Sequence, residues 1–342
     1  MQNIDHKAPM ICVSAAGTDL LVIFTKDRPD RLRRILPGLA FPTENVILLD
    51  DSHRNENRLE NIQLAEMFNL NYHGKYEQQS VLGRLLLPDL QNFVGALGSV
   101  PWGLGFNRNY ALVLASLQKA TKLIMMDDDV DLEGSPVATD VLRLLDANRF
   151  VGAKIEQMPD DSIVGHIHRG AHVVQKRYAS GTFLGLQIDR PPVNFFVNHY
   201  NEDWIWLFLE NYGRPVFSPV SVKQLVFNPF VNWKDKVLFQ EYGEILWEGV
   251  TAASERGQFS LLENCDHWRI VISDRRQDID AIGSMELPGH ILPIAHGVRS
   301  HLLNYLDKAT CEPFVRFWKE YLELLPIWHR VMEHLCSQGW SE

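Results

Sequence analysis

Short apolar runs that alternate with segments of helical character constrain this chain more than any other feature. The runs occupy residues 20–24, 45–49, 70–72 and 122–126. Runs that are apolar at nearly every position predict strands buried on both faces, as in a parallel sheet. Helical spacing of apolar residues recurs between them, at 31–39, 59–68 and 107–120. The alternation predicts an α/β fold with a Rossmann-like, mostly parallel central sheet flanked by helices.

The second half of the chain has a different texture. Short strands are expected at 150–155, 162–167 and 182–188, followed by a helix over 200–212 that Asn201 opens. Residues 297–305 and 312–335 have helical spacing and many aromatic side chains, which predicts a C-terminal helical appendage. Residues 217–266 carry no clear pattern. The predicted units are 1–132 and 133–296, as two halves of one domain, and 297–342 as the extension.

Composition excludes several classes of protein. The 342 residues carry 33 Lys and Arg against 43 Asp and Glu, a formal net charge of −10. A broad nucleic-acid-binding face needs a surplus of cations, so no nucleic acid partner is expected. The cysteines form no C-x-x-C pair, which argues against a disulfide scaffold or zinc ribbon and favours a reducing compartment.

Location and assembly are constrained less tightly. We expect a cytoplasmic protein, because the polar N-terminus does not resemble a signal peptide and no apolar run approaches about 20 residues. Membrane contact through the C-terminal aromatic helices is disfavoured, since residues 316–333 carry both signs of charge rather than a basic face. The oligomeric state is not predicted.

Acidic side chains follow two of the predicted strands directly. Asp50 and Asp51 end one strand, and Asp127, Asp128 and Asp129 end another. Ligands of open parallel sheets bind beyond the carboxyl ends of the strands. Adjacent carboxylates repel one another unless a cation lies among them, and oxygen ligands suit Mg²⁺ or Mn²⁺. A metal site is therefore predicted here; the alternatives are a solvated acidic loop, a helix cap, or a metal frame shifted toward Asp131.

Further candidates lie at the starts of two predicted helices. Arg108 and Asn109 begin the helix over 107–120, where free N–H groups and an arginine favour an anion. Glu202 and Asp203 begin the helix near 200 and are candidates for a general base. Thr25 and Arg28, with Lys26, follow the first strand and are weaker candidates for ligand contact.

Histidines offer a second kind of metal site. His166 and His168 would share one face of a strand, yet no third ligand lies in register and no cysteine is near, so a zinc site is not favoured. His296 is retained as a further candidate metal ligand. The glycine fingerprints of serine hydrolases, P-loops and dinucleotide-binding folds do not occur.

The order of these motifs resembles a known family. The motifs are Thr25-x-x-Arg28-Pro29, Asp50-Asp51-Ser52, Gly105-x-x-Arg108-Asn109, Asp127-Asp128-Asp129 and Asn201-Glu202-Asp203-Trp204. Together they are similar to the GT-A-fold glycosyltransferases, above all to the inverting enzymes of family 2, over roughly residues 19–210. The resemblance implies a nucleotide-diphosphate sugar donor, a UDP-sugar in preference to a GDP-sugar, held by Mn²⁺ or Mg²⁺.

The resemblance also implies roles for individual residues. Asp50 or Asp51 would contact the base or ribose, while Asp127 and Asp128 would lie at the ribose and diphosphate. Asp129, with Asp127 and a C-terminal histidine such as His296, would ligate the metal. Asp203 or Glu202 would deprotonate an acceptor hydroxyl, on a carbohydrate or another molecule, with inversion at the sugar carbon. The first unit would then hold the nucleotide sugar and the second unit the acceptor.

Two other functions remain open. A nucleotidyltransferase that makes activated sugars would share the fold and the metal, but it usually carries a glycine-rich basic loop after the first strand, and residues 25–30 contain no glycine. A non-catalytic carbohydrate-binding or scaffold protein would explain why the motifs near Thr25 and Asp50 depart from the usual family pattern.

Overall fold

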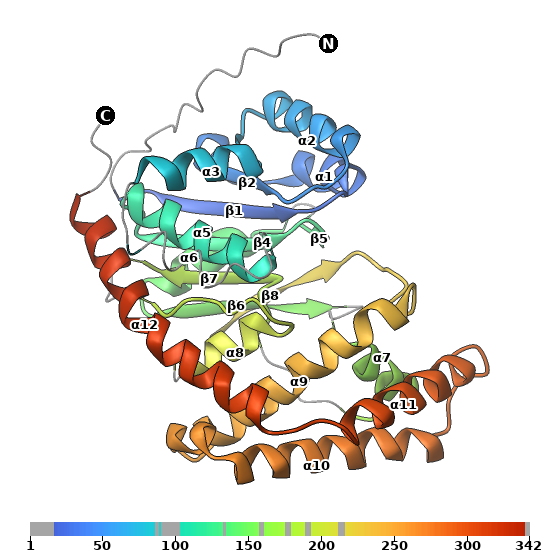
Figure 1. Cartoon of the computed structure of the whole chain (residues 1–342). Helices are drawn as coiled ribbons and strands as arrows, with labels where there is room; N and C mark the ends of the chain where they lie inside the picture. The colour runs from blue at the N-terminus through green and yellow to red at the C-terminus, as the bar shows by residue number, and fades with distance from the viewer. Residues whose placement is uncertain are drawn as a thin grey trace.

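The fold is known from a computed structural model, which describes residues 17–85, 89, 103–132, 135–156, 161–174, 179–188, 193–210 and 216–338. Its centre is an eight-stranded sheet in the order β3-β2-β1-β4-β7-β6-β8-β5 (Figure 1). The strands are β1 (Asp19–Thr25), β2 (Val46–Asp50), β3 (Asn71–His73), β4 (Lys122–Asp127), β5 (Val130–Asp131), β6 (Phe150–Glu156), β7 (Phe183–Gln187) and β8 (Val216–Gln224).

The sheet is mostly parallel. β1 pairs in parallel with β2 and β4, β2 with β3, and β6 with β8, whereas β7 runs antiparallel to β4 and β6, and β5 antiparallel to β8. The predicted α/β class and mostly parallel sheet are therefore confirmed. One sheet also runs through the predicted boundary at residue 132, because strands from both sides of it pair directly.

Helices cover both faces of the sheet, and a helical region continues beyond it. They are α1 (Pro29–Ile35), α2 (Asn55–Met67), α3 (Lys75–Arg84), α5 (Leu104–Leu117), α6 (Val137–Leu145), α7 (Ile163–Gly170), α8 (Glu202–Leu209), α9 (Trp233–Glu255), α10 (Cys265–Ala281), α11 (Leu292–Leu306) and α12 (Glu312–Gln338). The expected C-terminal helical region is confirmed; it begins at α9 and is larger than predicted.

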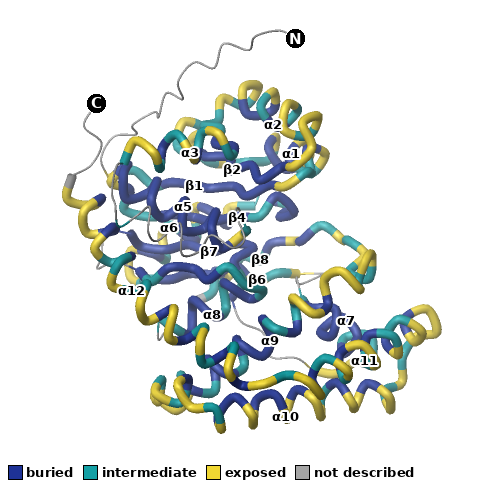
Figure 2. The backbone as a smooth tube through the Cα atoms, in the orientation of Figure 1, coloured by how far each residue is buried: buried dark blue, intermediate teal, exposed yellow. Residues whose placement is uncertain are grey.

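Alternate residues of β1 enter two different cores. Leu20, Val22 and Phe24 pack with α5, α8 and the C-terminal helices, while Leu21 and Ile23 pack with α1, α2 and α6. Because successive side chains of a strand point to opposite faces, a strand apolar at every position has to be covered on both. Figure 2 shows the resulting layer of buried strands between partly exposed helices.

Two sequence expectations for the second half are corrected. Residues 162–167 are not a strand: Ser162 caps α7, its hydroxyl accepting a hydrogen bond from the N–H of Gly165 at 3.0 Å. Residues 217–266, which carried no clear pattern, contain most of β8 and the long helix α9. Side-chain capping at Ser162 outweighs the alternation of apolar residues that suggested a strand.

The C-terminal helices are fixed to the rest of the molecule. α12 runs diagonally along the molecule in Figure 1, and Trp328 on it donates a hydrogen bond to the carbonyl of Val193 at 2.8 Å. A disulfide joins Cys265 to Cys311, 46 residues apart, so the start of α10 is tied to the start of α12. The cysteine spacing gave no sign of this pairing. None of the described helices is long and apolar enough to cross a membrane.

Candidate active site

Parallel pairing brings the acidic strand ends to one edge of the sheet. In the register of β1 with its neighbours, Thr25 lies opposite Asp50, and Phe24 lies opposite Asp127. The carboxyl ends of β2, β1 and β4 therefore meet, as expected for a doubly wound sheet. The predicted meeting of the residues near Thr25, Asp50 and Asp127 is observed.

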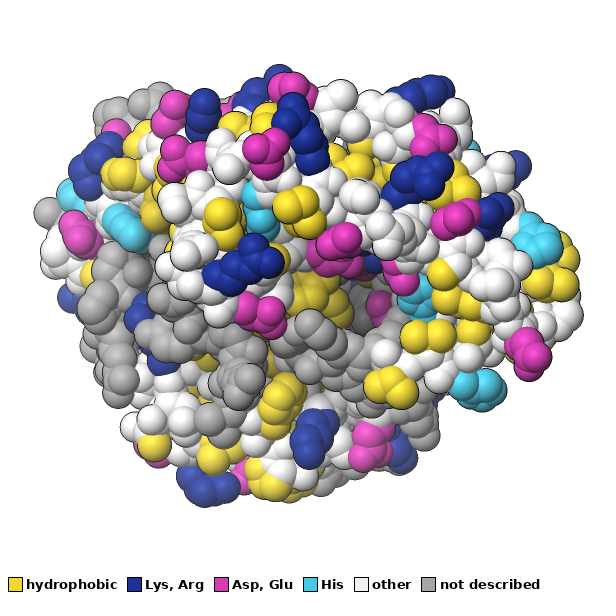
Figure 3. Space-filling view, turned by 90° about the horizontal axis from the view of Figure 1, so that it is seen from below, with side chains coloured by type: hydrophobic (Ala, Val, Ile, Leu, Met, Phe, Trp, Pro, Cys, Tyr) yellow, Lys and Arg dark blue, Asp and Glu magenta, His cyan; other side chains and the backbone are white. Residues whose placement is uncertain are grey.

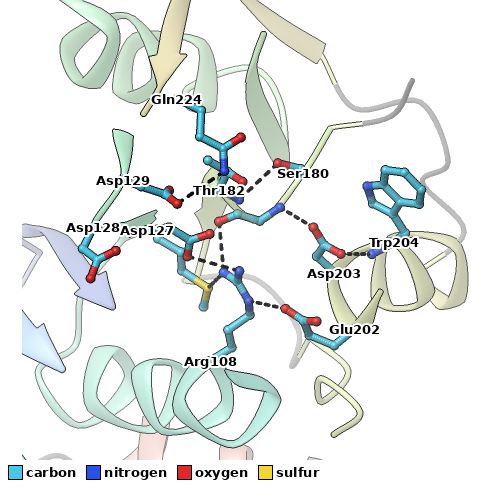
Figure 4. Close-up of polar contacts among 12 residues, drawn as sticks. Arg108, Asp127, Asp128, Asp129, Ser180, Thr182, Glu202, Asp203, Trp204 and Gln224 are labelled. Carbon is cyan, nitrogen blue, oxygen red and sulfur yellow. Dashed lines mark hydrogen bonds and ion pairs between the residues drawn. The ribbon is translucent and has the colours of Figure 1, made fainter. Parts of the chain in front are cut away.

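Asp128 is the most enclosed member of the aspartate triplet. Its side chain is fully buried, accepts a 2.6 Å hydrogen bond from the Thr25 hydroxyl, and lies 2.8 Å from the Arg28 guanidinium. Burial raises the pKa of Asp128 to about 6, although Arg28 acts in the opposite direction. Thr25 thus orients Asp128, and Asp128 holds Arg28 at the strand ends. The Asp128 carboxylate points away from those of Asp127 and Asp129 (Figure 4).

Asp129 combines a paired oxygen with an unsatisfied one. Its Oδ2 lies 2.7 Å from Arg31 and 3.5 Å from Arg28, and the Gln224 amide reaches the same atom at 3.5 Å. Its Oδ1 is buried and accepts no hydrogen bond from the described residues. A buried carboxylate oxygen without a donor is costly unless a ligand reaches it. The fit to a hard divalent cation is therefore good at Asp129 Oδ1, with Asp127 the neighbouring carboxylate.

Arg108 links the aspartates to the start of α8. The side chain is 1% exposed; it donates to Glu202 at 3.0 Å and to the Gly181 carbonyl at 3.0 Å, and it lies 3.5 Å from Asp127. Burial alone would lower the pKa of Arg108, but Asp127, Glu202 and Asp203 hold it above its ordinary value. Figure 4 shows this arginine between the two groups of carboxylates.

Glu202 and Asp203 have different surroundings although they are adjacent in sequence. Glu202 is buried against Arg108, and burial together with the charge of Asp203 raises the pKa of Glu202 to about 7. Asp203 is half-buried: it accepts the Gly181 N–H at 2.5 Å and the Trp204 N–H at 2.8 Å. α8 begins after Asn201, as the sequence predicted. The backbone of Asn201 is left-handed (φ 62°), and this turn fixes the start of the helix that carries Glu202 and Asp203.

Asp50 and Asp51 also divide into two roles. Asp50 accepts hydrogen bonds from the Tyr72 hydroxyl (2.9 Å), the Asn61 amide (3.1 Å) and the Ser52 N–H (2.8 Å). Its carboxylate is occupied by the protein itself, so the expectation that Asp50 contacts a base or ribose is not supported. Asp51 lies between Lys26 (3.5 Å) and Lys75 (3.4 Å). Burial raises the pKa of Asp51, and both lysines oppose that shift.

The start of α5 differs from the expected anion site. Asn109 donates to the Phe196 carbonyl at 2.8 Å and accepts from the Phe196 N–H at 2.7 Å, so its amide is used within the protein. A Cβ on Gly105 would lie 2.2 Å from the Val197 carbonyl oxygen. The glycines therefore allow α5 to approach the chain at 197–198 rather than a ligand. The Asn109 amide is therefore not available to an anion, and Arg108 binds carboxylates instead.

The structure corrects the predictions made for three histidines. His296 lies on α11 beside Asp280, Ser284 and Arg299, around a surface hollow of the α10–α11 pair. It does not join the strand-end aspartates, because α11 packs on α9, α10 and α7, away from that edge of the sheet (Figure 1). His166 and His168 lie on a helix rather than a strand, so they do not share a face as predicted.

Several site residues were missed in the sequence. Arg31, Gln224 and Lys75 all reach the strand-end carboxylates. Arg31 follows Arg28 by three positions, a spacing that places both on one side of a helical turn, so that signal was present. Gln224 and Lys75 lie on β8 and α3, which no local pattern connects to the aspartates.

Cations and anions are intermixed over the coloured part of the face in Figure 3, which has a hollow near its centre.

The comparisons with known proteins give distant structural likenesses only. No protein-family model matches the sequence, and no curated protein is similar to it. Glucosyl-3-phosphoglycerate synthase from Mycobacterium tuberculosis, crystallised with Mn²⁺, UDP-glucose and phosphoglyceric acid, is 10% identical over 71% of this chain and 81% of that chain, with a TM-score of 0.45. A mannosyltransferase from Pyrobaculum calidifontis, in complex with GDP-mannose and Mn²⁺, is 12% identical over 96% of this chain and 78% of that chain, with a TM-score of 0.41. At such low similarity neither activity transfers to this chain.

Proposed function

We propose that the protein is a metal-dependent glycosyltransferase, which moves a hexose from a nucleotide-diphosphate donor to an acceptor hydroxyl. The observation that carries this proposal is the position of Arg108. Its buried guanidinium contacts Asp127, next to Asp129, and Glu202, next to Asp203. The carboxylates that we assign to the metal and the carboxylate that we assign as the base therefore lie on either side of one buried arginine.

Asp129 and Asp127 would hold the divalent cation. The cation, when bound, would stabilise negative charge on the departing diphosphate. Arg28 and Arg31 lie within 3.5 Å and 2.7 Å of Asp129 Oδ2, so both are placed to contact the diphosphate as well. Asp51, at the end of β2, is the residue for the base or ribose, since Asp50 is occupied by Tyr72 and Asn61.

Asp203 is the better base of the acidic pair. It is half-buried and held by the N–H groups of Gly181 and Trp204. Two N–H donors fix the carboxylate in place, and its partial exposure leaves it accessible to an acceptor hydroxyl. Glu202, buried against Arg108, positions that arginine. A base on the acceptor side supports a direct displacement with inversion at the sugar carbon.

Release of the nucleotide diphosphate tests this function. The wild type, supplied with UDP- or GDP-sugars, Mn²⁺ and a panel of hydroxyl acceptors, should release UDP or GDP. Asp203→Asn should lose transfer and keep nucleotide binding. Asp129→Asn should lose both, since the metal contributes several kcal/mol to the transition state, roughly 100-fold or more in rate. The product of any turnover, analysed by NMR, gives the anomeric outcome.

Asp131→Asn is the matched control. Asp131 is the alternative end of the metal frame, and it pairs with Arg34 on the surface at 3.0 Å. It should retain activity. If Asp129→Asn and Asp131→Asn behave alike, or if no nucleotide sugar is consumed under any condition, the proposed function is wrong.

A further inference from the structure

A second cavity lies against α8, the helix that carries the proposed base Asp203. It has a volume of about 400 Å³ and lies between α7, α8, α9 and α10. Trp204, which follows Asp203 in sequence, is part of its wall. Figure 4 shows Trp204 beside Asp203 at the start of α8. Trp247 on α9 also lines it, with its ring 5.2 Å from that of Trp204. The size is in the range of small-molecule sites.

The charges around this cavity are unbalanced. Its lining includes the carboxylates of Asp161, Glu244, Glu248, Glu255 and Asp278. Arg275 lines the cavity. Its Nε and Nη2 donate to the Glu241 carboxylate at 3.0 Å and 2.7 Å. Its Nη1 donates to Glu248 at 3.0 Å and to Asp278 at 3.4 Å. Four of the five N–H groups of Arg275 thus donate to carboxylates, and three carboxylates surround its single positive charge, so no net positive charge is left for an anionic ligand.

The histidine of the lining adds no positive charge. Burial lowers the pKa of His168, although Asp278 opposes that shift. Arg169, on the same helix, pairs with Asp161 at 2.8 Å. A phosphate or carboxylate in this cavity would meet carboxylates without a spare cation, which is unfavourable.

Two polar side chains at the cavity make no hydrogen bond to another residue that the structure describes. Glu244 is 7% exposed, and no described residue hydrogen-bonds its carboxylate. Thr251 is 6% exposed, and its Oγ1 is buried without a hydrogen-bond partner among the described residues. Buried polar groups are normally satisfied, so each of these invites a hydrogen bond from a ligand. They lie two helical turns apart on α9, on the side that faces the cavity.

We propose that this cavity binds the acceptor as a sugar ring that carries no phosphate or other acid group. Glu244 and Thr251 would bind hydroxyl or amino groups of the ring, and the faces of the tryptophans would cover its apolar C–H surface. This assignment rests on the proposed function, because it names the acceptor for Asp203. Burial raises the pKa of Glu244 to about 7, so near neutral pH its carboxyl group can both donate to and accept from a hydroxyl.

Ligand-observed NMR and calorimetry with defined sugars test the proposal without turnover. The probes are glucose, N-acetylglucosamine and glucosamine, each beside its 6-phosphate, with and without UDP or GDP and Mn²⁺. Unphosphorylated sugars should bind at least about tenfold more tightly than their phosphates. Thr251→Val and Glu244→Met should each weaken binding roughly five- to tenfold, the effect of one lost hydrogen bond. Tighter binding of glucosamine than of glucose would identify an amino sugar as the ligand, as the surrounding carboxylates favour.

A control outside the cavity separates specific from general effects. Glu263→Gln replaces an exposed carboxylate of the 3₁₀ segment Phe259–Glu263 and should leave sugar binding unchanged. Equal or tighter binding of the phosphates, or no binding of any sugar, would overturn the proposal. Sugar binding that persists while no nucleotide diphosphate binds would uphold the cavity and refute the transferase.

Discussion

Two buried arginines organise two acidic regions of this molecule in different ways. Arg108 is 1% exposed and connects β4, the Gly181 segment and α8, so it lies between the proposed metal and base carboxylates. Arg275 is 7% exposed and connects α9 to α10 through Glu241, Glu248 and Asp278. The first couples parts of a site, whereas the second closes one wall of a cavity. Similar buried ion pairs thus serve positioning in one region and charge balance in the other.

Replacing each arginine should give the largest effects. Arg108→Met leaves Glu202 buried without its partner, and Arg275→Met does the same to Glu241; each should lower the free energy of unfolding by about 3–5 kcal/mol. Urea denaturation measures this. Arg108→Met should also abolish nucleotide-diphosphate binding, while Arg275→Met should preserve it in the folded fraction.

Arg276→Met is the matched control for both. Arg276 pairs with Asp307 at 2.8 Å on the surface, and both side chains are about half exposed. The loss of stability should be small, because exposed ion pairs are screened by solvent. If Arg275→Met lost nucleotide binding as completely as Arg108→Met, the contrast between coupling and charge balance would fail.

Reduction should destabilise the helical region that contains Arg275. The Cys265–Cys311 disulfide closes a loop of 46 residues, and its removal should cost about 2–4 kcal/mol. The double variant Cys265→Ala/Cys311→Ala should show this loss in denaturation, and reductant should have no further effect on it. Cys336→Ala, at the exposed free cysteine, should match the wild type. A wild-type protein indifferent to reductant would contradict this linkage.

The pH dependence of the free energy of unfolding should show a smaller effect, which comes from Glu244 in the cavity. Burial raises the pKa of Glu244 from 4.5 to about 7, so the folded state keeps a proton that the unfolded state releases. Stability contributed by this group is therefore present below about pH 4.5 and lost as pH rises toward 7 and above. Glu244→Gln should remove a decline on the order of 1–3 kcal/mol between pH 5 and 8. Parallel wild-type and variant curves would refute that assignment; Glu263→Gln is the control.

The first half of the fold could be predicted because its strands are uniform. Runs such as residues 20–24 and 122–126 are apolar at nearly every position, and that pattern has few alternatives to a strand covered on both faces. Residues 162–167 were predicted as a strand because their apolar spacing fits one, but Ser162 caps a helix there. Local pattern could not locate α9, whose apolar residues face both α8 and α10.

The site was predictable only where chemistry followed a strand directly. The triplet Asp127–Asp129 stood out because three carboxylates follow a buried strand directly, and the pair Glu202–Asp203 because it follows the triplet in the order of the motifs. The separate roles of Asp50 and Asp51 depend on Tyr72 and Asn61, which reach Asp50 from elsewhere in the chain. His296 was predicted as a metal ligand, but the helical region that carries it packs away from the aspartates. Tertiary contacts, which spacing does not encode, decided these cases.

Thermal unfolding with UDP, GDP, CDP and TDP, each with and without Mn²⁺, tests the central claim most directly. Ligands that bind only the folded state raise the midpoint by mass action. We expect one nucleotide to raise the unfolding midpoint of the wild type and of Asp131→Asn, in each case only with Mn²⁺. The same nucleotide should not raise the midpoint of Asp129→Ala. No rise with any nucleotide, or a rise that Asp129→Ala retains in full, would contradict it.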